Sequence, residues 1–239
     1  EKTVRAQAEW KKAHGEKCSI VDSKNAREME PEISPAALGA LHVPGVKQVR
    51  TPRVLQALVA ALVARGVSLF PHREVLSIDS AHISSQGVVV RTADGEFEAR
   101  SVLVAAGAWG ARVLETAGVR AAVRPVRGQV VLLRDETLRV RHMILDEEYI
   151  APRGDGLFLV GATVDESGFD KRTTAEGVRH LIARAVAMIP ALARAEVSAT
   201  WAGLRPATAD RLPYIGRVGE TPIYAAVGHF RHGLILGPL

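Results

Sequence analysis

The sequence has few of the residues and patterns that mark several large classes of protein. Its 239 residues include a single cysteine, Cys18, so no internal disulfide can form and nothing indicates an oxidising compartment. No apolar run approaches the ~20 residues of a membrane-spanning helix. The first ten residues, EKTVRAQAEW, are too charged for a secretory signal. We therefore expect a soluble, cytoplasmic protein without a membrane span.

Several catalytic signatures are also missing. The sequence contains no nucleophile elbow, no phosphate-binding loop and no CxxC pair, so hydrolase and kinase functions lose most of their support. His229 and His232 are three residues apart, but no third ligand lies near them in the sequence, so we predict no metal site. No internal repeat and no low-complexity tract interrupts the chain.

The composition is that of an ordinary globular protein, with 47% hydrophobic and 24% charged residues. This length allows one large core or two smaller ones. The net charge of +5 could indicate a nucleic-acid partner, but the basic residues are scattered among acidic ones. A mixed, solvated surface is the better interpretation, and we expect no nucleic acid to bind.

Two segments carry strong helical patterns, and residues 4–13 carry a weaker one. In residues 51–65, Thr51 is expected to cap the helix, Pro52 suits its first turn and Gly66 ends it. The other helix should begin after Thr174 and stop before Pro190. Both are amphipathic, and the apolar face of the first is formed by Val54, Leu55, Leu58, Val59, Leu62 and Val63.

The remaining apolar segments indicate strands. Residues 67–70 and 75–79 are predicted as short strands, and residues 87–100 as a hairpin that turns at Asp94 and Gly95. The run SVLVAAGAWG (101–110) is typical of a strand buried on both faces of a parallel sheet and followed by a helix through Leu114. From Val123 onward, short β-branched segments indicate an antiparallel sheet. The expected class is α/β (α+β), with two interleaved domains.

Glycine-rich turns follow apolar strands at three places: Gly107 with Gly110, Gly203, and Gly228 with Gly233. A glycine after a strand allows a ligand to approach the backbone closely, although any one of these could be a plain tight turn. Unusual side chains accompany all three turns, namely Trp109, Arg205, His229, Phe230, Arg231 and His232.

Arg205 and Tyr149 have two interpretations each. The guanidinium of Arg205 could bind a carboxylate through two parallel hydrogen bonds, or it could pair with Asp210 at a domain boundary. Tyr149 could be a half-buried core aromatic, or its hydroxyl could donate a hydrogen bond to the same carboxylate. The acidic run from Asp146 to Glu148 is interpreted as a solvated loop.

The combination of several motifs resembles the glycine oxidase and D-amino acid oxidase family of FAD-dependent amine oxidases. The matching segments lie between Thr51 and Pro238 and are VLVAAGAWG (102–110), RPVRGQ (124–129), DEEYIAPR (146–153), LFLVGAT (157–163), GLRPATADRLPYIG (203–216) and AAVGHFRHGLILGP (225–238).

The resemblance implies an activity and a set of site residues. The cofactor would be FAD, and the substrate glycine, a small D-amino acid or an N-methyl amine. Hydride transfer from Cα to flavin N5, hydrolysis of the imine and release of hydrogen peroxide would follow, without a side chain acting as general base. Molecular oxygen would be the acceptor, a homo-oligomer is compatible with the family, and thiamine biosynthesis is the pathway suggested. The substrate would meet Arg205, Tyr149 and Arg231; FAD would meet Val75, Gly107, Ala108, Trp109, His229, Phe230, Arg231, His232, Gly233, Leu234 and Ile235.

The chain departs from the family pattern in two respects. Glu147 stands where glycine oxidases are expected to have a histidine, which leaves the preferred amine open. The strand, GxGxxG turn and helix that would hold the FAD pyrophosphate are also missing, so we expect an incomplete chain that retains FAD weakly or not at all. The predicted flavin domain comprises residues 48–112 and 203–239, and the substrate domain residues 1–47 and 113–202. Two alternatives are an amino acid dehydrogenase with another acceptor and a flavin-free remnant that acts as a binding module.

Overall fold

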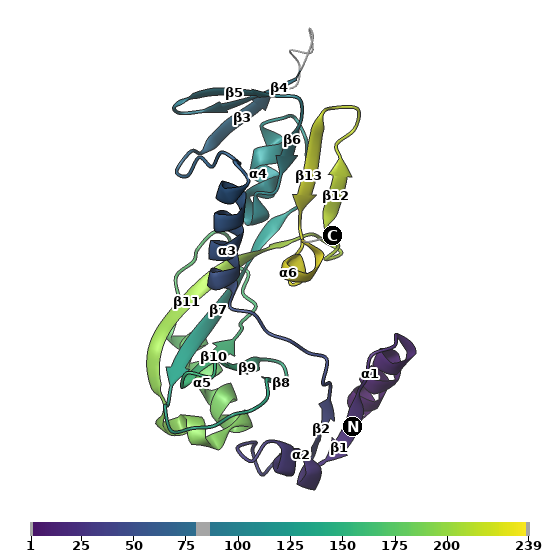
Figure 1. Ribbon diagram of the computed structural model, residues 1–239, viewed down its shortest axis with the longest axis vertical. Helices are drawn as coiled ribbons and strands as arrows, with labels where there is room; N and C mark the ends of the chain where they lie inside the picture. Colours follow the sequence, from purple (N-terminus) through teal and green to yellow (C-terminus); the bar gives the residue numbers. More distant parts are fainter. Residues whose placement is uncertain (1, 80–86, 238–239) are drawn as a thin grey trace. The chain divides into compact units, whose positions relative to one another are not determined.

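The computed structural model describes residues 2–79 and 87–237, so Pro238, which ends the last motif, lies outside the described residues. The chain folds into two compact units that it enters several times (Figure 1). Unit 1 contains residues 1–65, 129–163 and 173–201, and unit 2 contains residues 66–128, 164–172 and 202–239. This confirms a mixed fold of helices and antiparallel sheets. The assignment of residues 48–112 and 203–239 to a flavin domain stays a prediction.

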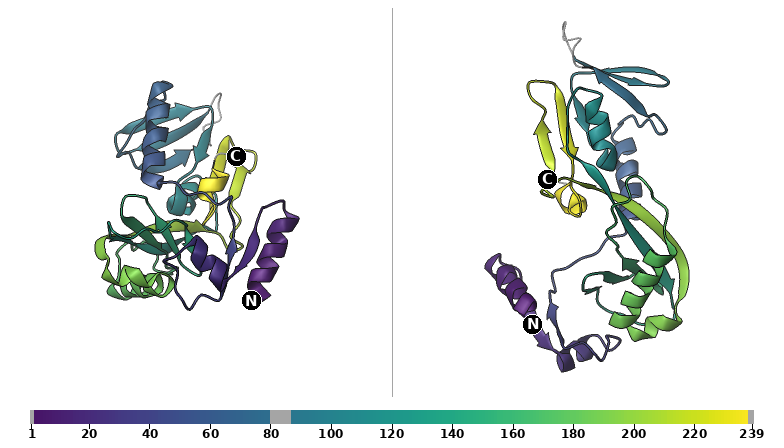
Figure 2. Two further views of the ribbon diagram at one scale, coloured as in Figure 1. Left: turned by 60° about the horizontal axis from the view of Figure 1, so that its bottom comes forward. Right: turned by 180° about the vertical axis from the view of Figure 1, so that it is seen from behind.

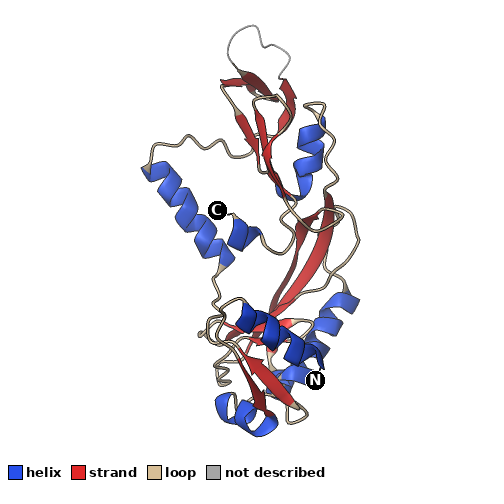
Figure 3. Ribbon diagram, turned by 90° about the vertical axis from the view of Figure 1, so that its right-hand side faces the viewer, coloured by secondary structure: helices blue, strands red, loops and turns tan. Residues whose placement is uncertain are grey.

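Unit 1 begins with a small helical and β layer, shown in Figure 3 with helices in blue and strands in red. Helix α1 (Lys2–Ala13) confirms the weak helical pattern at the amino terminus. Strand β1 (Ser19–Asp22) pairs antiparallel with β2 (Gly39–His42). Between them lies α2 (Ser23–Met29), which begins where the side chain of Asp22 accepts a hydrogen bond of 2.8 Å from the backbone N–H of Asn25.

A five-stranded sheet with the order β11-β7-β10-β9-β8 follows, and helix α5 packs against it in both views of Figure 2. The strands are β7 (Arg124–Arg134), β8 (Ile144–Leu145), β9 (Tyr149–Pro152), β10 (Leu157–Gly161) and β11 (Glu196–Ala207). Helix α5 (Ala175–Met188) is capped by Thr174, as predicted, and is followed by the short helix η2 (Pro190–Arg194). Leu181 and Ala185 of α5 are fully buried against the sheet residues Val131, Phe158 and Val160.

Unit 2 holds two three-stranded sheets around a second core. One sheet has the order β3-β4-β5, from β3 (Val75–Asp79), β4 (Val88–Thr92) and β5 (Gly95–Ala99); its hairpin turns at Ala93 and Asp94, one residue earlier than predicted. The other has the order β12-β13-β6, from β6 (Val102–Val104), β12 (Tyr214–Arg217) and β13 (Ile223–Val227). Short helices η1 (Gly107–Trp109), α4 (Gly110–Glu115) and α6 (Gly233–Leu236) follow strands of this second sheet.

Strand β6 is parallel to β13, as predicted, but it is not buried on both faces. Val104 is buried with Leu114 of α4, whereas the side chain of Leu103 is 63% exposed. Tyr224, the register partner of Leu103 on β13, is also exposed. Among the described residues, the sheet is therefore covered on one face only, and an apolar run in the sequence does not reveal how many faces of a strand are covered.

Helix α3 (Thr51–Ala64) confirms the strongest helical pattern, with two differences. Arg50 is the N-cap residue and Thr51 is already helical, so the predicted cap was wrong by one residue. The apolar face is largely exposed, and no residue of α3 is buried, because nothing in the described part of the chain covers it. Residues 67–70 do not form the predicted strand, since no strand among the described residues pairs with them. No helix in the described part of the chain is long and apolar enough to cross a bilayer.

A buried carboxylate, which the sequence did not single out, joins the small amino-terminal layer of unit 1 to the segment before β8. Glu30 is 3% exposed, and its Oε2 atom accepts hydrogen bonds from the backbone N–H groups of Arg141 (2.7 Å) and His142 (3.0 Å). The ring Nδ1 of His142 lies 3.3 Å from the same oxygen. Burying a carboxyl group is costly unless it is hydrogen bonded, so these donors on Oε2 fix the segment, whereas Oε1 is buried without a partner among the described residues.

Replacing this carboxylate should destabilise unit 1. Glu30→Ala leaves two partly buried backbone donors without this acceptor, so we expect the free energy of unfolding to fall by about 1–3 kcal/mol in urea denaturation. Glu28→Ala is the control, because Glu28 is exposed on α2, the helix that Glu30 caps, and lies 4.0 Å from Lys24; it should change stability by less than about 0.5 kcal/mol. Equal losses in the two variants would contradict this role of Glu30.

Candidate functional site

Two glycine turns of unit 2 lie at the same edge of one sheet. Strands β6 and β13 are parallel, with Val104 paired to Ala225, so the turns that follow them leave the sheet on the same side. Gly107 follows β6 with φ +52°, and the position of a Cβ there would meet open space. Gly228 follows β13 with φ +84°, and a Cβ there would lie 2.6 Å from Cγ2 of Thr208. A residue with a side chain is therefore strained at both turns and obstructed at the second.

The end of β11 brings Arg205 to the second of these turns. Ala207 forms an antiparallel bridge with His229, and the backbone N–H of Phe230 donates a hydrogen bond of 2.8 Å to the carbonyl of Pro206. Arg205 lies one residue before Pro206 and two before Ala207. The structure thus places Arg205 next to the segment around His229 and Phe230 within a single unit, although the two are distant in sequence.

The guanidinium of Arg205 occupies the space that a side chain at position 128 would take. A Cβ on Gly128 would lie 2.5 Å from Cζ of Arg205, so only glycine fits beneath it. Gly128 is buried in β7, and Arg205 is half-buried. Gly128 was missed as a site residue, although a glycine inside a β-branched segment often marks close approach of another group.

Neighbouring Arg127 anchors a loop beside the first glycine turn. Its buried guanidinium lies 3.2 Å from the carboxylate of Asp165 and 3.8 Å from that of Asp170, and it donates a hydrogen bond of 2.9 Å to the carbonyl of Arg172. Asp170 has its pKa lowered to about 2, because the side chain and backbone N–H of Arg172 donate to it and Arg127 is close. This loop, residues 164–172, was not predicted as part of the site.

The loop carries an aromatic residue to the turn after β6. The Phe169 ring centroid lies 5.5 Å from that of Trp109, and the guanidinium of Arg112 lies 3.9 Å from the Phe169 centroid. Trp109 itself is 43% exposed. Phe169, with Arg112 over its ring, therefore packs against the indole while leaving part of the indole surface open.

The other predicted residues of unit 2 lie in the segments that follow β6 and β13, except for Val75, which lies in the other three-stranded sheet. Phe230 has φ +48°, and both Arg211 and Arg231 place their guanidinium 5.5 Å from its ring. Leu234 and Ile235 of α6 are exposed, and Ala108 is buried. Val75 begins β3 and packs against the core of unit 2. No group of three potential metal-binding side chains exists among the residues described.

Tyr149 belongs to unit 1 and begins β9. It is half-buried and pairs in register with Gly161 of β10. The position of a Cβ on Gly161 lies 2.7 Å from the Tyr149 hydroxyl oxygen, so the ring crosses the strand where no side chain intervenes. The preceding acidic run is not uniformly solvated, contrary to our interpretation: Asp146 and Glu147 are exposed, but Glu148 is 7% exposed and hydrogen bonded.

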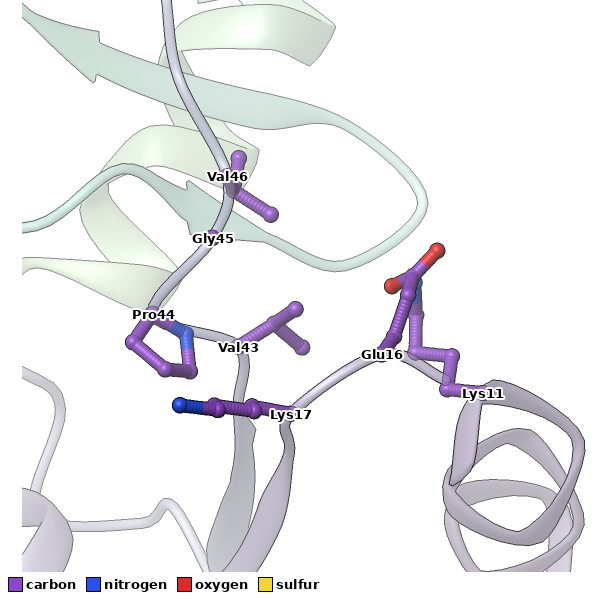
Figure 4. A pocket seen from close by; sticks show the side chains of 7 residues that line it. All are labelled: Lys11, Glu16, Lys17, Val43, Pro44, Gly45 and Val46. Carbon is purple, nitrogen blue, oxygen red and sulfur yellow. The ribbon is translucent and has the colours of Figure 1, made fainter. Parts of the chain in front are cut away.

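A surface pocket of unit 1 contains none of the predicted site residues. Figure 4 shows its lining, in which the Nζ atom of Lys11 lies 2.6 Å from a carboxylate oxygen of Glu16. The other lining residues are Lys17, Val43, Pro44, Gly45 and Val46. Because Lys11 is already paired with Glu16 and the wall apart from Lys17 is apolar, we assign no function to this pocket.

Comparison with known proteins agrees with the fold and the motifs. The sequence model of the family described as FAD dependent oxidoreductase (DAO) matches residues 1–239. Glycine oxidases of Geobacillus kaustophilus and Pseudomonas putida are 37% and 38% identical, over 94% and 96% of this chain. The chain spans about three-fifths of each, 60% and 63% of their lengths.

Solved structures show the same relationship. The crystal structure of the Geobacillus kaustophilus glycine oxidase superimposes with a TM-score of 0.93 at 35% identity, over 98% of this chain and 63% of that one. A glycine oxidase from Bacillus cereus gives a TM-score of 0.90 at 29% identity, over 99% and 66%. The fold is therefore that of flavin-dependent amine oxidases. The chain belongs to the FAD dependent oxidoreductase family, which confirms the resemblance seen in its motifs.

Filling the space at Gly128 should disturb Arg205. Gly128→Ala forces the guanidinium to move by an ångström or more, and we expect this overpacking to lower the free energy of unfolding by about 1–3 kcal/mol in urea denaturation. Gly203→Ala is a matched control, since Gly203 lies on the same strand as Arg205 and a Cβ there meets nothing within 4 Å. Unchanged stability of the Gly128→Ala variant would show that Arg205 does not depend on this space.

Proposed function

We propose that the full-length protein, of which this chain is a part, is an FAD-dependent oxidase of glycine or another small amino acid or N-methyl amine. The observation that carries the proposal is the Arg205 guanidinium, seated over Gly128 beside the turn at His229. A half-buried guanidinium at the edge of a parallel strand pair is suited to bind a small carboxylate. The similarity of the chain to glycine oxidases supports the substrate class.

The residues present fit a flavin cofactor. The two parallel strands end in glycine turns at one edge of the sheet, and the backbone at Gly107 is open to close approach. We infer that the backbone of residues 107–109 and 229–235 lines the cofactor, and that the backbone of Val75 meets its adenine. When bound, FAD would accept the hydride from the substrate Cα and pass the electrons to oxygen, giving hydrogen peroxide.

The side chains of this chain orient the substrate. Arg205 binds the carboxylate in a bidentate manner, Tyr149 donates a hydrogen bond from its hydroxyl, and Arg231 adds positive charge at the rim. Because orientation and electrostatics are their whole contribution, no side chain has to act as general base. Water then hydrolyses the imine product. Glu147 takes the place of the expected histidine, so the preferred amine is to be found by testing glycine, D-alanine and N-methylglycine side by side.

Removing the Arg205 guanidinium should weaken substrate binding while leaving the cofactor bound. Each charge-assisted hydrogen bond contributes about 1.5–3 kcal/mol, so Arg205→Ala should raise the Michaelis constant at least ~10-fold. Arg205→Lys retains the charge but loses the planar pair of donors, so its affinity should lie between those of the wild type and the Ala variant. FAD content, measured from absorbance, should stay equal in all three proteins.

Arg217→Ala serves as the control, because within the described part of the chain Arg217 donates only to the backbone carbonyls of Glu220 and Thr221 in its own hairpin. Near-normal turnover of the Arg205→Ala variant at low substrate would refute the carboxylate assignment. A peroxide assay on the wild-type protein tests the electron acceptor: substrate oxidation without peroxide would indicate a dehydrogenase. Full-length protein that binds no flavin would contradict the proposed function itself.

A further inference from the structure

A buried carboxylate at the start of β9 is held by two side chains of α5. Glu148 is 7% exposed. His180 Nε2 lies 2.7 Å from its Oε1 atom, and Arg184 Nε donates to its Oε2 atom at 2.8 Å. Both carboxylate oxygens are therefore occupied, and the residue that follows is Tyr149.

The same arginine holds the rest of the turn between β8 and β9. Its Nη2 atom donates to the carboxylate of Asp146 and lies 4.0 Å from that of Glu147. The backbone N–H of Asp146 donates to the carbonyl of Glu148 at 2.8 Å, which closes the turn. One guanidinium on a rigid helix thus contacts every acidic side chain of a three-residue turn.

The electrostatics explain why these contacts are strong. Burial raises the pKa of Glu148, but the hydrogen bonds and charges of His180 and Arg184 outweigh it, and the net pKa is below its ordinary value. The carboxylate is therefore ionised at neutral pH. A buried charge whose partner is removed is costly, so the hairpin without Arg184 has to shift and expose Glu148 to water.

We propose that Arg184, assisted by His180, is a positioning residue that fixes the Tyr149 hydroxyl for substrate binding. The inference rests on the proposed function, because it takes Tyr149 as a substrate-binding residue. The ring of Tyr149 crosses Gly161, where the missing side chain leaves room for it. Its position along the sheet depends on the backbone at Glu148, and that backbone depends on α5.

The first test compares two arginines of α5 in the full-length, flavin-loaded protein. Arg184→Met keeps much of the length of the side chain and removes the guanidinium. We expect the Michaelis constant to rise roughly 5- to 50-fold, with the maximal rate changed less than about twofold. Arg184→Lys should recover part of the affinity. Arg179→Met is the control, since Arg179 is exposed and, among the residues that the structure describes, donates only to the carbonyl of Ala175; it should leave both constants unchanged.

A double-mutant cycle shows whether the effect passes through Glu148. Arg184→Met and Glu148→Gln remove opposite ends of one ion pair, so their effects on the Michaelis constant should not add, whereas independent effects would. Additive effects, or an Arg184→Met protein with the wild-type Michaelis constant, would overturn the inference.

The pH dependence of substrate affinity distinguishes this positioning role from a purely structural one. Glu148 is faced by His180 and Arg184 of α5 and by Asp146 and Glu147 of its own turn. The pKa of Glu148 is lowered in the folded protein. Its ionised form, with the contacts to His180 and Arg184, is therefore fully present above the ordinary carboxyl pKa and is lost as the pH falls through the lowered pKa. Removing Arg184 raises that pKa. The affinity of Arg184→Met should therefore begin to fall at a higher pH than that of the wild type, and identical profiles would contradict the proposal.

Amide hydrogen exchange over residues 144–152 separates this inference from the proposed function, because it needs no turnover. Arg184→Met should accelerate exchange in this hairpin, and Arg179→Met should not. Unchanged exchange would overturn the positioning role even if the protein oxidises amines. Faster exchange in a protein that oxidises no amine would refute the oxidase function while leaving the mechanical coupling between α5 and the hairpin in place.

Discussion

The candidate site depends on one steric fact, which is that a guanidinium fills the space left by a missing side chain. Arg205 can lie flat against β7 only because position 128 is glycine. The pairing of Ala207 with His229 then carries the same strand end to the glycine turn after β13. A charged group, a turn with positive φ and a parallel strand edge are thereby brought together within unit 2, and only their combination marks a candidate binding site.

Charge compensation is the second recurring feature of the structure. Arg127 is surrounded by Asp165, Asp170 and the carbonyl of Arg172, and Glu148 by His180 and Arg184. In both clusters a buried charge ties a loop to a regular element, and both loops border predicted site residues. Buried ion pairs of this kind contribute little net stability, but they penalise any movement that separates the partners. Such clusters suit segments that must stay in place while the surrounding surface remains open to a ligand.

The apolar surface is distributed differently from the charge. The cores of both units are closed, whereas the apolar face of α3 and the outward side of β6 remain exposed. These faces consist of the same residue types as the buried ones and follow the same periodicities. Exposure at these places therefore reflects which neighbours the described chain supplies. It is not a difference in the local sequence.

The sequence alone determined the elements whose signals are local: the helices at 51–64 and 175–188, the cap at Thr174, the hairpin around Asp94 and the family motifs. These depend on backbone preferences and on periodic burial within a few residues. Tertiary structure alone decided that Gly128 lies under Arg205, that Arg127 anchors residues 164–172, that Glu148 is buried, and that residues 67–70 find no partner strand. Those outcomes depend on contacts between residues distant in the chain. A local pattern predicts which side chains and strands favour burial or pairing, but only the assembled fold determines whether another segment buries or pairs with them.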